Sequence, residues 1–375
     1  ATPGSVNALL VDEYGPEELG RGLAQLLGTD DFQRIEATEK DDVGGTTLVL
    51  RPLEKSWGPQ YLHAGLAMSS DFAGDSDFTV SLDHRATWLT RRGLEWRNRV
   101  SIGQVNSIDS ELRQPLDRGR RWFAALRGGF LQEERELFVQ GDSVAGYRNR
   151  RAVAGLGVGR RLGNYGEFEV GVETGRVDAI RITGLDAVFP DIRRRTSAIT
   201  AGFVADRLDD LDFPQSGHLL SVDARLSRSA AGGDERYDRA QFVAQQAFGG
   251  GPASLLLGVR HGTSFGSSLP FYDPFTAGGF LDLSGYERDE ILAERFTVAS
   301  AVWRQRIGGG SGLLPGLYVG ASVEHAEVGR SLNGFPDDSV TGGSVFLSAQ
   351  SVLGPFYLGA GYGEGGRTSL YLYVG

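Results

Sequence analysis

One short segment of the chain has the residue types and the spacing of a serine nucleophile. Gly262-Thr263-Ser264-Phe265-Gly266 matches the Gly-x-Ser-x-Gly pattern, in which a sharp turn between a strand and a helix exposes the serine hydroxyl. A Gly- and Ser-rich stretch follows Gly266 in place of a helical pattern, and the chain contains no Asp-Gly-Gly or Asp-Gly-Ala that would supply a partner acid. We therefore expect Ser264 to lie where a strand enters a loop, and we expect this chain to be no enzyme.

Metal and acid–base chemistry have no stronger support. The five histidines do not cluster at metal-ligand spacing: His63, His84, His218, His261 and His325. Neighbouring acids such as Glu167 and Glu169 share one face of a strand, and repeated charges along a water-filled interior explain them better than general acid–base catalysis. No Gly-rich loop has the strand–loop–helix setting that binds phosphates. We expect no metal and no other cofactor.

The composition limits the class of protein. The chain has 375 residues, of which 55 are Gly and none is Cys, so it can form no disulfide. Its net charge of −10 argues against nucleic acid as a partner. No apolar run approaches the ~18–20 residues that a transmembrane helix needs. A closed barrel of short alternating strands is the other structure that can cross a membrane.

From Gln60 onward, apolar and polar residues alternate in repeated short segments. Residues 167–173 are typical, because Phe168, Val170 and Val172 alternate with glutamates. A soluble β-sandwich also alternates, but the polar face here repeatedly carries Arg and Glu, and tight connections alternate with long ones, as in outer-membrane barrels. The pattern predicts a mainly β fold, a 16-stranded antiparallel transmembrane β-barrel over residues 58–375. The expected strand starts are 60, 77, 93, 107, 121, 145, 165, 190, 217, 236, 252, 292, 315, 341, 355 and 367.

Residues 1–57 have a different pattern. Pro16-Glu17-Glu18-Leu19 opens an expected helix, with Pro at its start and acids in its first turn, and Gly28 ends it. Residues 32–37 and 46–51 are two expected strands on either side of a turn. This order predicts a small α+β domain ahead of the barrel. Four aromatic residues near expected strand ends suit the girdles of a membrane barrel: Trp88, Trp96, Trp122 and Tyr237.

The longest connection in the last third of the chain is expected over residues 264–290, between the eleventh and twelfth strands. Connections of this length are uncommon and are usually functional. Residues 278–286 read Gly-Gly-Phe-Leu-Asp-Leu-Ser-Gly-Tyr, so this stretch can turn tightly and anchor itself through its aromatic side chains. We expect the connection to fold into the lumen, and the alternative is a plain Gly-rich external loop.

The run Leu283-Ser284-Gly285-Tyr286 resembles the tip of the inward-folded sixth loop in the Omp85 superfamily of outer-membrane barrels. In most of that superfamily the tip reads hydrophobic-Arg-Gly-aromatic, and the Arg makes a charged contact with the barrel wall. Ser284 stands here in the place of that Arg. The position of residues 264–290 in the strand order also matches the family's sixth loop.

Further segments resemble the same superfamily. Leu317–Val328 is similar to the thirteenth strand, in which an inward acid meets the loop tip, and Glu324 takes the position of that acid. The resemblance implies that Glu324, together with Gly320 and Ser322 on the same face, forms the wall contacts of the loop. Two smaller features also fit: Phe213-Pro214-Gln215-Ser216-Gly217 is similar to a periplasmic Pro-x-x-Gly turn, and Arg304 and Arg306 lie near the periplasmic end of the twelfth strand.

Within the superfamily, Glu54–Leu62 and the loop tip most resemble the patatin-like outer-membrane phospholipases, or type Vd autotransporters. These proteins carry a secreted lipase domain, then one POTRA domain, then a sixteen-strand barrel. Residues 1–57 accordingly resemble a partial, periplasmic POTRA domain, and the alternative is a small α+β cap of unknown role. Outer-membrane barrels usually end on an aromatic residue, whereas this chain stops at Val374-Gly375, so we expect a few native residues to follow.

The resemblance implies a translocator in the bacterial outer membrane that passes or holds an N-terminal lipase passenger absent from this chain. Its implied partners are outer-membrane lipid, the fused or upstream passenger domain, the outer-membrane assembly machinery and, in some arrangements, a second copy in a homodimer. Two alternatives stay open. One is an assembly or two-partner-secretion barrel of the same superfamily, and the other is a passive diffusion porin.

Overall fold

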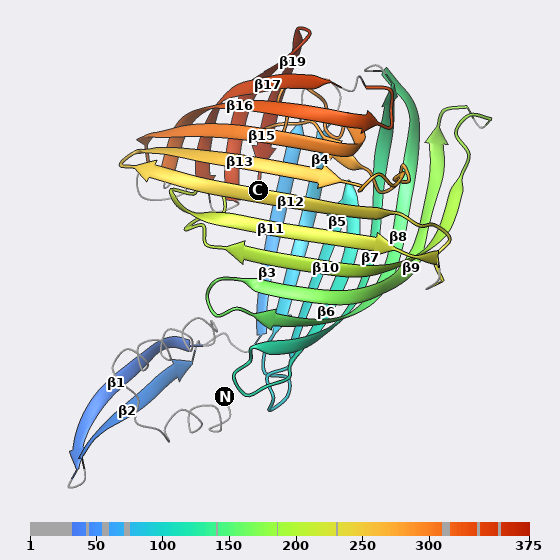
Figure 1. The fold of residues 1–375 in the computed structure, drawn as a ribbon. Coiled ribbons are helices and arrows are strands. Elements are labelled where there is room, and N and C mark those ends of the chain that lie inside the picture. The colour runs from blue at the N-terminus through green and yellow to red at the C-terminus, as the bar shows by residue number, and fades with distance from the viewer. Residues whose placement is uncertain are drawn as a thin grey trace.

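A closed wall of antiparallel strands forms most of the described structure (Figure 1). The structure is a computed structural model, and it describes residues 32–42, 45–54, 60–70, 76–139, 142–185, 187–229, 232–309, 316–335, 338–351 and 354–375. Its strands are β1 (Phe32–Asp42), β2 (Gly45–Glu54), β3 (Gln60–Ser70), β4 (Ser76–Ala86), β5 (Glu95–Gly103), β6 (Val105–Pro115), β7 (Trp122–Val139), β8 (Asp142–Arg161), β9 (Glu167–Thr183), β10 (Ile192–Asp206), β11 (Ser216–Ser227), β12 (Asp238–Gly250), β13 (Ala253–Thr263), β14 (Phe275–Ala277), β15 (Ile291–Gly308), β16 (Gly316–Ser331), β17 (Ser339–Ser351), β18 (Gly354–Gly363) and β19 (Arg367–Val374).

Seventeen strands, β3 to β19, close the barrel, and sixteen of them form its wall. The exception is β14, a three-residue strand inside the connection from β13 to β15, which pairs with the first residues of β15. Each wall strand begins within three residues of its predicted start. The predicted 16-stranded antiparallel barrel is therefore confirmed, whereas β14 is a feature that the sequence pattern did not predict.

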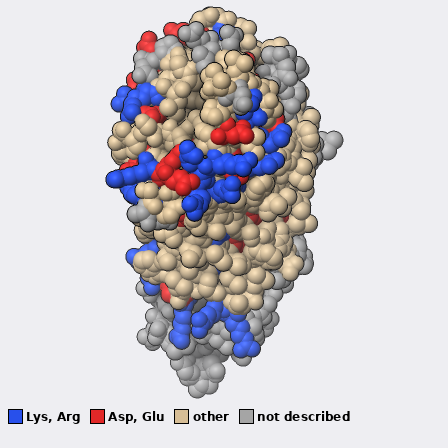
Figure 2. All heavy atoms as spheres, turned by 90° about the vertical axis from the view of Figure 1, so that its right-hand side faces the viewer, with Lys and Arg blue, Asp and Glu red and all other residues tan. Residues whose placement is uncertain are grey.

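The alternating residues sort to opposite sides of the wall. On β9, Phe168, Val170 and Val172 are exposed on the outer surface, while Glu169 and Glu173 make ion pairs inside the barrel. Figure 2 shows part of the outer surface as a broad uncharged face bounded by charged residues. An apolar exterior around a charged interior is the arrangement expected of a barrel in lipid.

The wall is taller on one side than on the other. β7, β8, β9 and β10 contain 18, 20, 17 and 15 residues, whereas β3, β4, β5 and β6 contain 11, 11, 9 and 11. A strand needs ~9–11 residues to cross the hydrocarbon layer. The extra length of β7–β10 therefore extends beyond that layer.

Three of the four predicted girdle residues lie near strand ends or in a turn outside the lumen, and the fourth lies inside the barrel. Trp96 and Trp122 are exposed on the outer surface near strand ends, and Trp88 lies in the turn after β4 beneath the guanidinium of Arg120. The prediction is wrong for Tyr237, which is buried inside the barrel, where its hydroxyl donates to Asp273 at 2.6 Å. The hydrogen bond and the packing against the long connection hold this side chain away from lipid.

Ahead of the barrel, β1 and β2 pair as an antiparallel hairpin, from Phe32 opposite Glu54 to Asp42 opposite Gly45. These strands include the two predicted over residues 32–37 and 46–51. The helix predicted from Pro16 lies outside the described residues, so the assignment of residues 1–57 to a partial POTRA domain stays a prediction. None of the helices among the described residues has the length and apolarity to span a membrane.

Candidate functional site

Residues 264–290, the inner loop, join β13 to β15 and pack against the inner face of the wall. Leu269, Phe275, Leu283 and Tyr286 of the inner loop are buried in one cluster with side chains of β15 and β16. β14 adds backbone pairing to β15 along the same stretch. The inner loop therefore lies folded against the barrel wall, held by both apolar contacts and strand pairing.

The tip of the inner loop is a compact turn that its own backbone closes. The amide of Leu283 donates to the carbonyl of Gly279 at 3.0 Å, and the amide of Leu281 donates to the hydroxyl of Ser284 at 3.2 Å. Gly285 has a φ of +90°, a left-handed backbone conformation that residues other than glycine rarely adopt. The turn thereby presents the amides of Ser284 and Gly285 outward from the tip.

Two buried hydrogen bonds join the tip to the wall. The amide of Ser284 donates to Oε2 of Glu324 on β16 at 3.2 Å, and the amide of Gly285 donates to the hydroxyl of Tyr371 on β19 at 2.9 Å. Ser284 and Glu324 both have 0% of their surface exposed. Because a buried amide without a partner is costly, these acceptors fix the position of the tip.

Glycines of the neighbouring strands make room for the tip. A Cβ atom on Gly342 of β17 would lie 2.3 Å from the carbonyl oxygen of Ser284, and one on Gly361 of β18 would lie 2.9 Å from the amide nitrogen of Gly285. Gly363 has a similar role beside Tyr286. Sequence reasoning missed these glycines and Tyr371, although glycines repeated on the lumen-facing positions of β17 and β18 are the signal that could have identified them.

The tip contact contains no ion pair. In the described part of the chain, Glu324 bonds to no Arg, Lys or His, and its Oε1 atom is buried without a hydrogen-bond partner. Ser284, which carries no charge, stands where the superfamily resemblance places an Arg. The tip is therefore held through its backbone and its packing, where a bidentate Arg would have given a charged contact.

The other two predicted wall contacts do not bond to the tip. The hydroxyl of Ser322 lies 2.6 Å from that of Ser344 on β17. Gly320 acts through a neighbour, since a Cβ there would lie 2.4 Å from the ring of Phe346. Phe346 in turn packs edge-on against Phe280 of the inner loop, with ring centroids 5.7 Å apart.

An aromatic column continues from Phe280 toward the opposite end of the barrel. Tyr357 of β18 packs against Phe280 at 5.5 Å and against Phe213 at 5.8 Å, and Phe213 stacks on Tyr318 of β16 at 4.8 Å. Phe213 belongs to the turn between β10 and β11 that the sequence predicted as a Pro-x-x-Gly turn. The guanidinium of Arg304 lies 5.7 Å from the Phe213 ring, inside the barrel.

The turn that carries Phe213 has its own internal support. The carboxylate of Asp209 accepts hydrogen bonds from the amides of Gln215 at 2.9 Å and Ser216 at 3.0 Å. These backbone hydrogen bonds, first that of Ser216 and then that of Gln215, lower the pKa of Asp209. The turn is thereby fixed in the shape that directs Phe213 into the barrel.

Charged side chains anchor the rest of the inner loop. Asp273 accepts from Tyr237 and pairs with Arg239 of β12, both from the wall. At the far end of the loop, Glu290 pairs with Arg367 of β19 at 2.7 Å. The loop is therefore tied at its first half, at its tip and at its end, each time to a different part of the wall.

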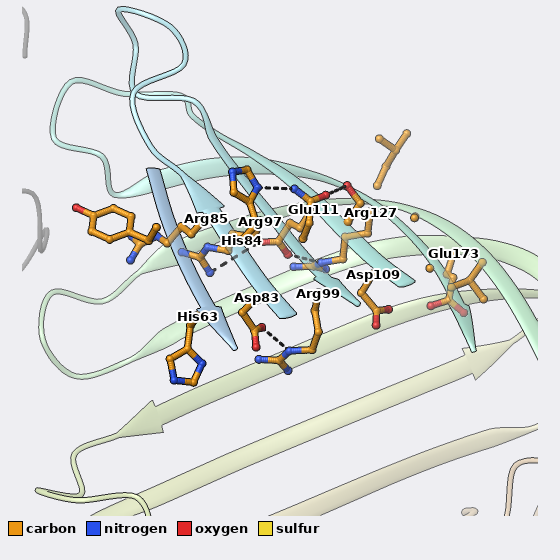
Figure 3. Close-up of a pocket in the computed structure, with 18 of the residues that line it drawn as sticks. His63, Asp83, His84, Arg85, Arg97, Arg99, Asp109, Glu111, Arg127 and Glu173 are labelled. Carbon is orange, nitrogen blue, oxygen red and sulfur yellow. Dashed lines mark hydrogen bonds and ion pairs between the residues drawn. The ribbon is translucent and has the colours of Figure 1, made fainter. Parts of the chain in front are cut away.

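A cavity of about 1190 Å³ remains on the inner face of the shorter side of the barrel, and no residue of the inner loop lines it. Figure 3 shows charged side chains directed into it from several strands. Four arginines and four acids line it, so neither sign dominates: Arg85, Arg97, Arg99, Arg127, Asp83, Asp109, Glu111 and Glu173. Pairs such as Arg99 with Asp83 at 2.5 Å and Arg127 with Glu111 at 2.6 Å neutralise one another.

The wall is weakest where its last strand meets its first. β19 pairs with β3 through three residues, Leu372–Val374 opposite Met68–Ser70, whereas the next shortest pairing between described wall strands, β5 with β6, has seven. The pairing with β19 does not extend to residues 60–67 of β3. We call this junction the seam.

Ser264, the nucleophile candidate from the sequence, begins the inner loop. It is buried, and its carbonyl accepts from the amide and the hydroxyl of Ser267. Turns and irregular chain follow Ser264 as far as β14, whereas in a nucleophile elbow a helix follows the serine. The surroundings of Ser264 are those of a strand end entering a loop.

We predict that Glu324→Ala loosens the inner loop and raises the single-channel conductance of the barrel. The substitution leaves the buried amide of Ser284 without its acceptor, which costs about 1–3 kcal/mol. Glu324→Gln keeps an acceptor oxygen and is expected to stay close to the parent protein. Currents in planar bilayers measure the effect, and equal currents for Glu324→Ala and the parent would count against the contact.

We also predict that Gly285→Ala lowers the temperature at which the barrel unfolds, read as the loss of its heat-modifiable gel mobility. Its Cβ would lie 2.1 Å from the amide nitrogen of Gly363. Gly266→Ala is the matched control, because Gly266 has a similar φ of +85° but no atom within 4 Å of an added Cβ. Equal shifts in the two variants would mean that the tip does not touch the wall at Gly363.

Several solved structures share this fold. BamA from Haemophilus ducreyi lacking POTRA domains 1–3 aligns with a TM-score of 0.70 and 12% identity, covering 100% of this chain and 81% of that one. CdiB from Acinetobacter baumannii aligns with a TM-score of 0.62 and 15% identity over 97% of this chain and 69% of that one. CdiB from Escherichia coli aligns with a TM-score of 0.62 and 10% identity over 91% and 66%. At these identities the likeness concerns the fold alone.

Sequence comparison gives the family. No curated protein matches the chain. The Omp85 superfamily domain, however, matches residues 135–346, which is more than half of the chain and contains the inner loop, β15 and β16. The chain belongs to the Omp85 superfamily, whose barrels lie in the bacterial outer membrane.

Proposed function

We propose that this chain is the membrane half of a type V secretion protein, and that its barrel passes an N-terminal passenger to the cell surface or holds it there. The balanced charge of the lumen is the observation that carries the proposal. Four arginines and four acids line the cavity on the shorter side of the barrel. A polypeptide of mixed sequence meets no net repulsion there, whereas a lumen of one sign would favour one class of ion.

The sequence resemblance is the basis on which we propose a passenger. Glu54–Leu62 and the loop tip resemble the patatin-like branch, so we propose a patatin-type lipase as the passenger, and a periplasmic position for residues 1–57. The hairpin of β1 and β2 is compatible with the end of a POTRA domain. We propose that catalysis belongs to the passenger, because Ser264 is buried and no elbow surrounds it.

A second candidate is the assembly of other outer-membrane proteins at the seam. The three-residue pairing of β19 with β3 favours it, because a strand whose pairing is short can take up a strand from a client. Both functions need outer-membrane lipid around the barrel and the cell's assembly machinery to insert it. A homodimer is compatible with either.

The passenger proposal predicts that a reporter domain fused ahead of Ala1 reaches the outside of the cell. The full chain carries the reporter in a Gram-negative host, and protease added to intact cells measures its exposure. The same reporter without the barrel is the control and is expected to stay protected. A reporter that stays protected although its barrel shows heat-modifiable mobility would contradict the proposal.

A disulfide across the seam separates the two candidates. Ser70 and Leu372 are opposite one another in β3 and β19, and the chain has no cysteine of its own. Directly opposed residues of antiparallel strands have Cα atoms about 4.5–5.5 Å apart, and a disulfide joins Cα atoms about 4.4–6.8 Å apart. In the Ser70→Cys/Leu372→Cys variant, passage through the lumen should be kept, whereas strand exchange at the seam should be lost.

The matched control is Ala360→Cys/Leu370→Cys, which links β18 to β19 within a hairpin that has eight residue pairs. It introduces the same chemistry away from the seam and should leave either function intact. Loss of reporter export in the seam variant alone, restored by a reductant, would contradict passage through a closed lumen and would show that the seam must open.

A further inference from the structure

Four arginines form a cluster near the end of the tall side of the barrel: Arg150 on β8, Arg176 on β9, and Arg193 and Arg195 on β10. We call them the outer arginine cluster. Arg176 lies directly opposite Arg195 in the strand register, and Asp178 lies opposite both Arg150 and Arg193. The four side chains therefore surround one carboxylate on three adjacent strands.

The cluster faces away from the lumen. On β9, Val170 and Val172 are exposed on the outer surface. Residues of one strand that are separated by an even number of positions point to the same face. Arg176 and Asp178 are therefore on the outer side, and so are the residues opposite them in the register. Figure 2 shows basic and acidic residues gathered in a band across this side of the molecule.

The cluster is short of negative charge. Asp178 pairs with Arg176 at 3.0 Å, and Asp234 lies 3.8 Å from the more exposed Arg195. Arg150 bonds to the neutral amide of Gln132 at 2.8 Å, and Arg193 has no ion-pair partner among the described residues. Four arginines against these two acids leave a surplus of two positive charges. Like charges directly opposite one another destabilise a sheet unless a counter-charge lies between them.

The cluster lies where the apolar exterior ends. Continuing along the outer face of β8 from Arg150, the residues are Ala152, Ala154, Leu156 and Val158. On β9, Thr174 separates Arg176 from the exposed Val172. The first charged row above an apolar band is at the depth of lipid headgroups. The strands are about 4.8 Å apart and residues of one face about 7 Å apart, so the cluster is roughly 10 Å wide.

We propose that the outer arginine cluster binds the phosphates of a diphosphorylated glycolipid in the outer leaflet. The guanidinium group bonds phosphate in a bidentate manner, so four of them spread over roughly 10 Å can contact both phosphates of one headgroup, each of which carries about −1.5 to −2 charges at pH 7. The inference rests on the orientation contained in the proposed function, in which residues 1–57 are periplasmic and the inner-loop end faces outward.

The test measures binding of diphosphoryl lipid A to the detergent-purified full chain by native mass spectrometry. Arg176→Gln/Arg195→Gln is expected to weaken binding about tenfold or more, because each removed Arg loses one attraction to phosphate. Arg91→Gln/Arg92→Gln is the matched control, since these exposed residues of the turn between β4 and β5 lie at the other end of the barrel and the change in net charge is the same. The control is expected to bind like the parent.

Two comparison lipids decide what is recognised. Dephosphorylated lipid A and phosphatidylglycerol are both expected to bind at least tenfold more weakly than diphosphoryl lipid A. Equal binding of either lipid, or an equal loss in both double variants, would overturn the proposal. Heat-modifiable mobility shows that each variant is folded, and reporter export is expected to continue in the cluster variant. A parent chain that binds diphosphoryl lipid A but does not export the reporter would therefore count against the proposed function and not against the cluster.

Discussion

Peptide groups that cross a hydrocarbon layer must find their hydrogen-bond partners within the protein, and the architecture of this chain follows from that requirement. Sixteen wall strands meet it by closing on themselves. Closure fixes which residues face lipid and which face the lumen, because successive side chains alternate. The same requirement is met least well where the barrel closes, because β19 and β3 pair through only three residue pairs. Each of these strands pairs with its other neighbour, β18 or β4, through eight or more residue pairs.

A barrel of this size does not fill its own interior, and the inner loop occupies one side of it. Its tip needs close approach of one backbone to another, which explains why Gly342, Gly361 and Gly363 line the wall there. The tip contact relies on amides that donate to Glu324 and Tyr371. A contact made by the backbone tolerates Ser284 in place of an Arg, because its donors are present whatever the side chain is. The other side of the interior keeps the charge-balanced cavity.

Much of the wall could be predicted, because alternation and turn residues are local properties of the sequence. Strand starts, the strand count and the range of the inner loop all depend on patterns within about ten residues. The positions that depend on tertiary contacts were harder. Tyr237 has the residue type and the position near a strand end that are typical of an aromatic girdle, yet its hydrogen bond to Asp273 of the inner loop holds it inside the barrel. β14 is too short to produce a pattern, and the role of Tyr371 depends on a partner 86 positions away in sequence.

Hydrogen exchange of the inner loop, followed by mass spectrometry on the detergent-purified chain, tests whether the tip is docked inside the barrel with its amides bonded to the wall. If it is docked, a peptide covering residues 278–286 exchanges about as slowly as one from β16, and much more slowly than the exposed turn at residues 162–166. Exchange of the tip as fast as that turn would contradict the account, because the amides of Ser284 and Gly285 would then be open to water.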